Sequence, residues 1–201
     1  MPTFKSTHST ALMDSAQLVD RIRDFAQEQL SPPRVAHVAR VALLTVDLCV
    51  RFDVDADSGL LAAWGHDLAR EWSHEALLST AVKDGQPISP LEREHPVLLH
   101  GRVGALILSD RFSVSDEEVL DAVRHHTLGH RRLGTLGKVL YVADYFEPGR
   151  GFLGAATRRV IAGDDLDQMV LAAIDDVRRR GLELAEPTQQ LETELQRRVT
   201  D

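Results

Sequence analysis

The chain has 201 residues, of which 43% are hydrophobic and 27% are charged, and its formal net charge is −8. This composition is typical of a globular protein with enough apolar residues for one substantial core. The acidic balance excludes a broad nucleic-acid-binding surface, which needs an excess of Lys and Arg. It leaves room for a small phosphorylated ligand, for which a bound metal ion can supply the positive charge.

The single cysteine, Cys49, excludes an internal disulfide, and its apolar neighbours indicate a buried side chain rather than a nucleophile. Residues 1–15 have no pattern of charged and then apolar residues that would indicate a signal peptide. No apolar run approaches the ~20 residues that a membrane-spanning helix needs. We therefore expect a cytoplasmic protein with no membrane partner.

Hydrophobic residues recur with helical spacing in nearly every segment, which predicts an all-α fold with a single domain. The predicted helices cover residues 12–30, 32–52, 58–68, 74–84, 96–109, 116–126, 133–146, 152–163 and 165–184. Ser31, Asp57 and Ser115 are the expected N-caps, the last in a capping box with Glu118. The polar stretch 85–95 contains two prolines and is expected to be a loop.

The chain is expected to divide into three regions. Residues 1–30 are predicted to pack on the core as an N-terminal helix, and residues 31–185 to form the main helical domain. Residues 186–201 are expected to be a flexible C-terminal tail, because the sequence there is polar.

Several histidines and two aspartates stand at helical positions that otherwise face the core. These candidates are His37, His66, Asp67, His100, His126 and Asp144. A lone histidine on an apolar face is usually an ordinary core residue, so the inference depends on how many occur together with carboxylates. Burying an ionised carboxylate costs several kcal/mol unless it is paired or bound to a metal. The set therefore predicts a metal site, and imidazole with carboxylate suits iron, manganese or zinc.

The order of these residues, His37, then His66-Asp67, then Asp144, resembles the HD superfamily of metal-dependent phosphohydrolases. Three longer segments are more specific than that two-residue signature: LLHGRVGA at 98–105, EEVLDAVRHHTLG at 117–129 and KVLYVADYFEPGR at 138–150. They resemble the YqeK family of symmetrical diadenosine tetraphosphate hydrolases. The resemblance extends over about residues 31–180.

This resemblance implies an HD-type helical bundle over residues 31–185. It implies that diadenosine tetraphosphate and related dinucleoside polyphosphates are cut symmetrically, giving two ADP. It also implies one or two metal ions, the first being iron held by His37, His66, Asp67 and Asp144. His100 and His126 would hold a second metal or the phosphates beside it.

The resemblance also implies the residues that contact substrate. These are His37, Asp67, His100, His126, Thr127, Asp144 and Arg150. Asp67, His100 and His126 are expected to be catalytic, and Asp67 is expected to bridge two metals. Either histidine could protonate the leaving phosphate if it is not bound to metal.

The chain departs from the family pattern in one segment. His125 stands where the family usually has an aromatic residue, and we expect it to pack or to make a supporting hydrogen bond rather than to bind metal. The family commonly has an arginine after HHTLG, whereas here His130 precedes Arg131 and Arg132. Arg131 would either replace that arginine with a shift, or the contact is changed.

Three other interpretations keep the same residues. The protein could be an HD nucleotidase or phosphodiesterase that acts on another nucleotide, or a nucleotide-binding regulator with little turnover. A purely structural metal site would be closed, and the surplus of ligands argues against it. Product analysis separates the two enzyme interpretations from the regulator, and a homodimer is left open.

Overall fold

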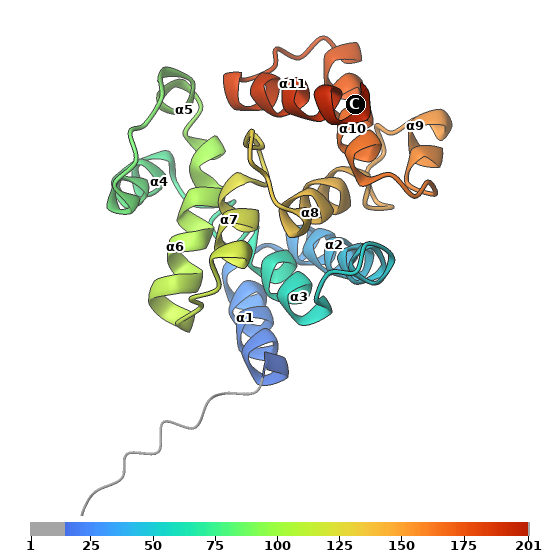
Figure 1. The fold of residues 1–201 in the computed structure, drawn as a ribbon. Coiled ribbons are helices and arrows are strands. Elements are labelled where there is room, and N and C mark those ends of the chain that lie inside the picture. Colours follow the sequence, from blue (N-terminus) through green and yellow to red (C-terminus); the bar gives the residue numbers. More distant parts are fainter. Residues whose placement is uncertain (1–14, 201) are drawn as a thin grey trace, which may run out of the picture.

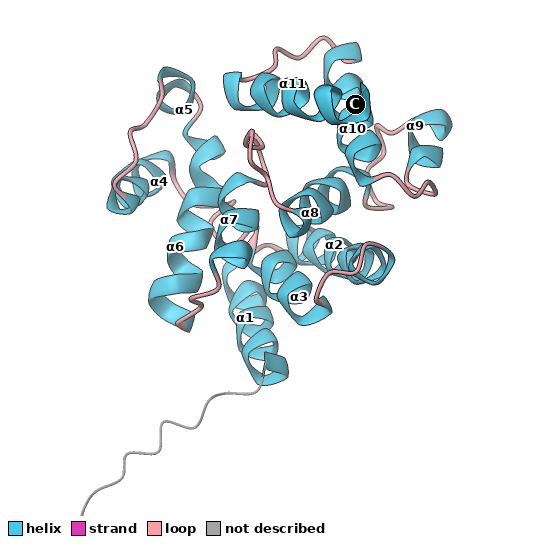
Figure 2. Ribbon diagram, viewed as in Figure 1, coloured by secondary structure: helices cyan, strands magenta, loops and turns pink. Residues whose placement is uncertain are grey.

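Helices make up all of the regular structure in the computed structural model, which describes residues 15–200. Figure 1 shows their arrangement, and Figure 2 shows helices joined by loops, with no strand in the described residues. The α-helices are α1 (Ser15–Gln29), α2 (Pro32–Arg51), α3 (Ala56–Gly65), α4 (His74–Ala81), α5 (Pro90–Glu94), α6 (His100–Phe112), α7 (Glu117–His125), α8 (Thr135–Phe146), α9 (Ala155–Val160), α10 (Leu166–Arg179) and α11 (Glu186–Thr200). Two 3₁₀ helices, η1 (Val82–Asp84) and η2 (Pro96–Leu99), lie between α4 and α6. The prediction of an all-α fold is confirmed.

Helix α3 lies at the centre of the bundle and packs against α1, α2, α7 and α8 (Figure 1). It is buried along most of its length, from Gly59 to Gly65, because its residues there are apolar or small. Helices α4 and α5 lie on one side of this centre, and α9, α10 and α11 lie on the other (Figure 1). Helix α3 ends at Gly65 inside the bundle, so the next two residues, His66 and Asp67, are buried there.

Two glycines of α6 let this helix cross its neighbours closely. A Cβ on Gly104 would lie 3.0 Å from the carbonyl oxygen of Gly65 at the end of α3. A Cβ on Gly101 would lie 2.8 Å from the carbonyl oxygen of Val123 in α7 and 3.1 Å from Nδ1 of His126. Only glycine permits such approach without moving the backbone. Both crossings bring the first turn of α6 against the ends of α3 and α7.

Two helices begin with a different cap from the one predicted. Asp55 rather than Asp57 caps α3, and Asp116 rather than Ser115 caps α7, each through its side-chain carboxylate. In both places two capping-type residues lie within two positions of each other, so local sequence does not decide between them. Ser31 does precede α2, but its hydroxyl donates to Glu71 (2.7 Å) instead of capping the helix.

The stretch 85–95, which was predicted to be a loop, contains helix α5. Ser89 and Glu92 form a capping box at its start, with Pro90 as the first helical residue. Proline is favourable at that position because its missing N–H has no partner within the helix. Pro90, one of the two prolines that suggested a loop, is therefore the residue that begins a helix.

The C-terminal segment is not the flexible tail that its polarity suggested. Residues Glu186–Thr200 form α11, with Leu191 and Leu195 each only 1% exposed. These two residues are four apart and lie on one face, which packs against the rest of the protein. Arg178 of α10 also pairs with Glu192 of α11 at 2.6 Å. Two buried leucines on one face are thus enough to hold this polar helix against the rest of the protein.

At the other end of the chain, α1 packs on α3 and buries Val19, Ile22 and Ala26. The first residues of the predicted 12–30 helix lie outside the described range. Among the residues that the structure describes, no helix combines the length and apolar character needed to cross a membrane.

Candidate metal centre

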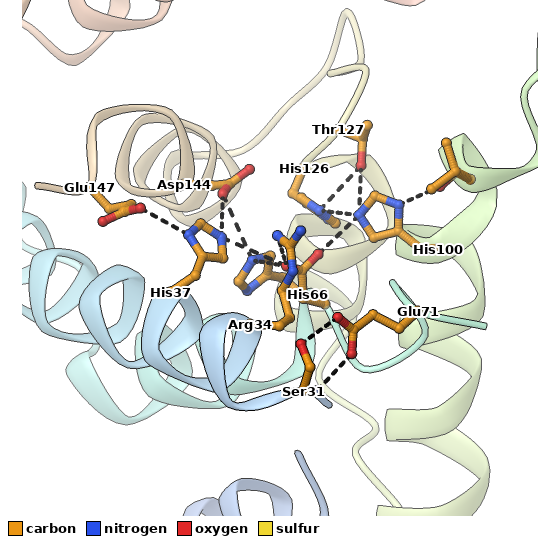
Figure 3. Close-up of polar contacts among 12 residues, drawn as sticks. Ser31, Arg34, His37, His66, Glu71, His100, His126, Thr127, Asp144 and Glu147 are labelled. Carbon is orange, nitrogen blue, oxygen red and sulfur yellow. Dashed lines mark hydrogen bonds and ion pairs between the residues drawn. The ribbon is translucent and has the colours of Figure 1, made fainter. Parts of the chain in front are cut away.

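Six side chains from five helical elements meet in the middle of the bundle. They are His37 in α2, His66 and Asp67 after α3, His100 at the start of α6, His126 after α7 and Asp144 in α8. Figure 3 shows the site residues as a row. His37 and Glu147 lie at one end of this row, His100 and Thr127 lie at the other end, and His66 lies in the middle. All six are the residues that the sequence singled out.

The six residues form three overlapping groups, each with ligand atoms within 4.8 Å of one another. The groups are His37 with His66 and Asp67, His66 with His126 and Asp144, and Asp67 with His100 and His126. Because each group shares members with another, the cluster is one continuous centre and not three separate sites.

Three of the histidines are held in the same way. In each, Nδ1 lies at hydrogen-bond distance from the backbone carbonyl three residues earlier. The pairs are His66 with Ala63 (2.6 Å), His100 with Val97 (2.5 Å) and His126 with Val123 (2.7 Å). A carbonyl only accepts, so Nδ1 carries the proton and Nε2 keeps its lone pair. Each Nε2 therefore faces the centre as a potential metal ligand.

His37 is oriented by a carboxylate instead. Its Nδ1 lies 3.1 Å from Oε1 of Glu147, which is only 2% exposed. Burial raises the pKa of Glu147, but Arg40 and His37 outweigh that effect and lower it to about 2. Arg40 donates to Oε2 of Glu147 at 2.5 Å. A carboxylate behind a ligating imidazole fixes its tautomer and increases its basicity.

Asp67 directs its two carboxylate oxygens to different parts of the centre. Oδ2 lies 3.5 Å from Nε2 of His66 and 3.7 Å from Nε2 of His37. Oδ1 lies 3.2 Å from Nε2 of His100. Arg34 of α2 donates to Oδ2 at 3.1 Å and so offsets part of the carboxylate charge. The Asp67 carboxylate therefore lies between two halves of the centre, one that contains His37 and His66 and one that contains His100.

Asp144 faces the same half of the centre as His37. Its Oδ1 lies 3.0 Å from Nε2 of His37 and 3.9 Å from Nε2 of His66. Arg150 donates to the backbone oxygen of Asp144 through Nε (3.0 Å) and to its Oδ1 through Nη2 (2.5 Å). The guanidinium thus binds the same carboxylate oxygen that faces His37 and His66.

The charges of the centre are strongly coupled. Burial raises the pKa of Asp67, but His66 and His100 hold it well below its usual range. Burial likewise opposes ionisation of Asp144, and His37 and His66 hold its pKa well below the ordinary value. Both aspartates are therefore ionised near neutral pH.

The pKa values of His126 and His66 are shifted in opposite directions. Burial, followed by the imidazoles of His100 and His66, lowers the pKa of His126 to about 3, so its ring is neutral. For His66, burial lowers the pKa but the Asp67 carboxylate raises it above its ordinary value. A proton and a metal ion therefore compete for Nε2 of His66.

Two buried nitrogens in the centre have no hydrogen-bond partner, namely Nε2 of His37 and Nε2 of His66. Leaving a buried polar atom unsatisfied costs about 1–3 kcal/mol, so such atoms need an explanation. Both face the carboxylate oxygens of Asp67 and Asp144 at 3.0–3.9 Å. Lone pairs and carboxylates that converge in this way fit a divalent cation of the transition series.

The HD domain family model matches residues 34–149, a range that contains all six residues of the centre. The chain belongs to the HD domain family. It is 35% identical over 148 residues to a protein of Bacillus subtilis (strain 168) named "Bis(5'-nucleosyl)-tetraphosphatase, symmetrical", covering 74% of this chain and 79% of the relative. A protein of the same name from Staphylococcus aureus is 30% identical over 144 residues, covering 72% of this chain and 74% of the relative. These similarities confirm the resemblance to the YqeK family.

A solved structure shares this HD fold. It is a crystal structure from Clostridium acetobutylicum, described as a predicted HD superfamily hydrolase involved in NAD metabolism. Its TM-score is 0.81 at 29% identity, covering 89% of this chain and 97% of that one. The helical arrangement around the centre is therefore that of an HD hydrolase.

The other expected residues lie at the edge of the HD centre. Thr127 Oγ1 is 3.2 Å from Nε2 of His126 and 3.4 Å from Nε2 of His100. Arg150 lies at the opposite end of the row, beside Asp144. The structure thus places both residues beside the centre, Thr127 next to His100 and His126 and Arg150 next to Asp144.

His125 does not belong to any of the three ligand groups. Its ring stacks on His130, and burial, followed by that neighbour, lowers the pKa of His125 to about 4. Arg132, and not Arg131, lines the same cleft as Thr127. Both alternatives for Arg131, replacement of the family arginine with a shift or a changed contact, stay predictions.

The HD centre is flanked by two clefts. One, of 320 Å³, is lined by His37, Arg34 and Arg150 among others. The other, of 680 Å³, is lined by Thr127 and the loop that follows it. One cleft thus includes His37 of the centre in its lining, and the other includes Thr127, which lies beside the centre.

Arg34, Arg40 and Glu147 were not among the residues predicted to form the site. Glu147 stands in the family-like segment KVLYVADYFEPGR, which was the signal that could have drawn attention to it. Arg34 lies one helical turn before His37, so it shares the face of α2 that meets the centre. Arg40 follows His37 at the same spacing.

Proposed function

We propose that this protein is a metal-dependent hydrolase that cleaves diadenosine tetraphosphate and related dinucleoside polyphosphates symmetrically, producing two ADP. The observation that carries the proposal is a pair of buried imidazole nitrogens on His37 and His66 that make no hydrogen bond and face two ionised carboxylates. The names of the relatives from Bacillus subtilis and Staphylococcus aureus support this choice of substrate.

The proposed ligands of a first metal ion are His37, His66, Asp67 and Asp144. His100 and His126 would bind a second ion or the phosphates beside it, with Asp67 shared between the two halves. Iron is the metal that the family resemblance implies, and the donor atoms also suit manganese or zinc. A bound ion would supply positive charge to the phosphoryl oxygens and a nucleophilic water near neutral pH.

The protein's own side chains would orient the polyphosphate around the scissile bond. Thr127 can donate its hydroxyl to a phosphate oxygen, and Arg150 offers a planar guanidinium to another. Burial and the imidazoles of His100 and His66 lower the pKa of His126 to about 3, so its neutral ring suits a ligand better than a proton donor. Of the two histidines considered for protonating the leaving phosphate, His100 is therefore the one we propose.

The test is product analysis with metal-loaded protein and diadenosine tetraphosphate. ADP as the sole product supports the proposal. ATP together with AMP shows asymmetrical cleavage and rejects it, as does tight binding without turnover, which identifies a regulator. Hydrolysis of other nucleotides only would assign the centre to another HD phosphohydrolase activity.

A further inference from the structure

The larger cleft lies beside the metal centre and includes Thr127 in its lining. The cleft has a volume of 680 Å³, within the range of about 300–1,000 Å³ that is typical of small-ligand sites. Its walls come from the loop after α7, the segment from η1 to η2 and the start of α11. Thr127 contacts both His100 and His126, so a phosphate chain held at the centre can pass this residue into the cleft.

Two imidazole rings form a stacked pair in the cleft wall. The ring centroids of His125 and His130 are 4.7 Å apart, and the rings are inclined by 20°. Neither ring is part of the six-residue centre. Histidine is among the side chains on which nucleobases stack. A base that enters the cleft can therefore extend the existing stack.

The charged groups of this cleft balance one another. Its lining contains three arginines and three carboxylates: Arg102, Arg124 and Arg132 with Asp84, Glu92 and Asp121. Arg102 pairs with Asp84 at 2.8 Å and with Glu92 at 3.2 Å. Arg124 pairs with Asp121. A wall without net charge suits an uncharged nucleoside better than additional phosphates.

Helix α11 holds the loop that carries the stacked pair. Thr188 Oγ1 donates to the carbonyl oxygen of Leu128 at 2.8 Å. Gly129 has a positive φ of 71°, and a Cβ there would lie only 2.6 Å from Leu191. The loop is thus fixed at two successive residues between Thr127 and His130. Such preorganisation lowers the entropy cost of binding a ligand.

We propose that this cleft binds the nucleoside of one substrate half, with the base stacked on the His125–His130 pair and the phosphates passing Thr127 to the centre. This inference rests on the proposed function, because it assumes a nucleotide substrate at the metal centre. It assigns a base-binding role to His130, a position where this chain departs from the family pattern.

The test compares metal-loaded wild-type protein with the His130→Ala and His130→Phe variants. Calorimetry measures the affinity for ADP and for inorganic pyrophosphate, which has no base. In His130→Ala, the affinity for ADP should fall by roughly fivefold or more while that for pyrophosphate is unchanged. His130→Phe should retain ADP binding because it keeps an aromatic ring. The matched control, His74→Ala, alters an exposed histidine on α4 and should bind both ligands normally.

Steady-state kinetics give a second measurement, with KM for diadenosine tetraphosphate rising in His130→Ala and kcat changing little. Unchanged ADP affinity in His130→Ala, or no binding of ADP to the wild type, would overturn the inference. An equal loss of ADP and pyrophosphate affinity would also overturn it, because that result indicates a displaced loop. The binding assay needs no turnover, so failure to hydrolyse the tetraphosphate would reject the proposed function without deciding the base site.

Discussion

Nδ1 of His37 lies 3.1 Å from Oε1 of Glu147, and this contact determines which nitrogen of His37 faces the metal centre. The other three histidines of the centre use backbone carbonyls for the same purpose. His37 lies inside α2, in its second turn, where the carbonyl three residues earlier accepts a hydrogen bond within the helix itself. A buried carboxylate from the segment after α8 takes its place.

The Glu147→Gln variant should bind metal about tenfold or more weakly, because outer-shell partners of ligating histidines typically contribute 10–100-fold to affinity. The substitution removes the charge that orients His37 and that pairs with Arg40. Competition with a chelator of known affinity measures the change. Glu94→Gln, an exposed residue at the end of α5, is the matched control. Equal affinities in both variants would contradict the role assigned to Glu147.

The Asp67→Ala variant should lose metal from both halves of the centre if two ions bind. Its Oδ2 faces His37 and His66, whereas its Oδ1 faces His100. Asp144→Ala should affect mainly the half that contains His37. Elemental analysis of the purified variants gives the number of ions per chain. An Asp67→Ala protein that loses only one of two ions would show that this carboxylate does not bridge them.

The Gly101→Ala variant should separate α6 from α7 and thereby weaken both the fold and the centre. The added Cβ would lie 2.8 Å from Val123 O and 3.1 Å from Nδ1 of His126. Overpacking of this kind typically costs about 1–3 kcal/mol, against about 1 kcal/mol gained in helix propensity. Urea unfolding and metal titration measure the two effects. Gly154→Ala, where nothing lies within 4 Å, should change neither.

The Leu191→Ala variant should lower the free energy of unfolding by about 2–5 kcal/mol, as truncation of a buried leucine usually does. Leu191 is 1% exposed and contacts Gly129 in the loop beside the centre. Chemical denaturation monitored by circular dichroism measures the loss. Leu182→Ala is the control, because that side chain is 51% exposed. Equal stability of both variants would mean that α11 does not contribute to the fold.

The thiol of Cys49 should be unreactive in the folded protein. Burial, assisted by the charge of Asp55, raises the pKa of this thiol to about 11, against about 8.5 for an exposed cysteine. Between these values the unfolded chain binds fewer protons than the folded one, so this thiol makes stability fall as pH rises. At about pH 8, iodoacetamide should label the protein in urea and not in buffer, as read by intact mass.

The Cys49→Ala variant tests whether this thiol causes the loss of stability at alkaline pH. Because Cys49 is the only cysteine, the Cys49→Ala variant removes the titrating group without leaving another thiol. Its unfolding free energy should fall less steeply than that of the wild type from about pH 8.5 to 11. Parallel slopes, or rapid labelling of the folded wild type, would show that the thiol is not protected.

The all-α fold and the six central residues could be predicted from the sequence because their signals are local. Helical periodicity shows which face of a segment is apolar, and a polar residue on such a face needs a partner or a ligand. His37, His66, His100 and Asp144 all interrupt apolar faces in this way. The order of these residues then carried the family resemblance.

Tertiary structure alone decided what depends on a partner distant in the sequence. Glu147 resembles any other acidic residue until Arg40 and His37, more than 100 residues earlier, are seen to bury and pair it. Helix α11 has a polar sequence, and only its packing against α10 and the loop at Gly129 explains why Leu191 and Leu195 are buried. The two clefts likewise exist only where separate helices meet. Local sequence determines which side chains need a partner, and the packing of helices far apart in the chain determines which partner they find.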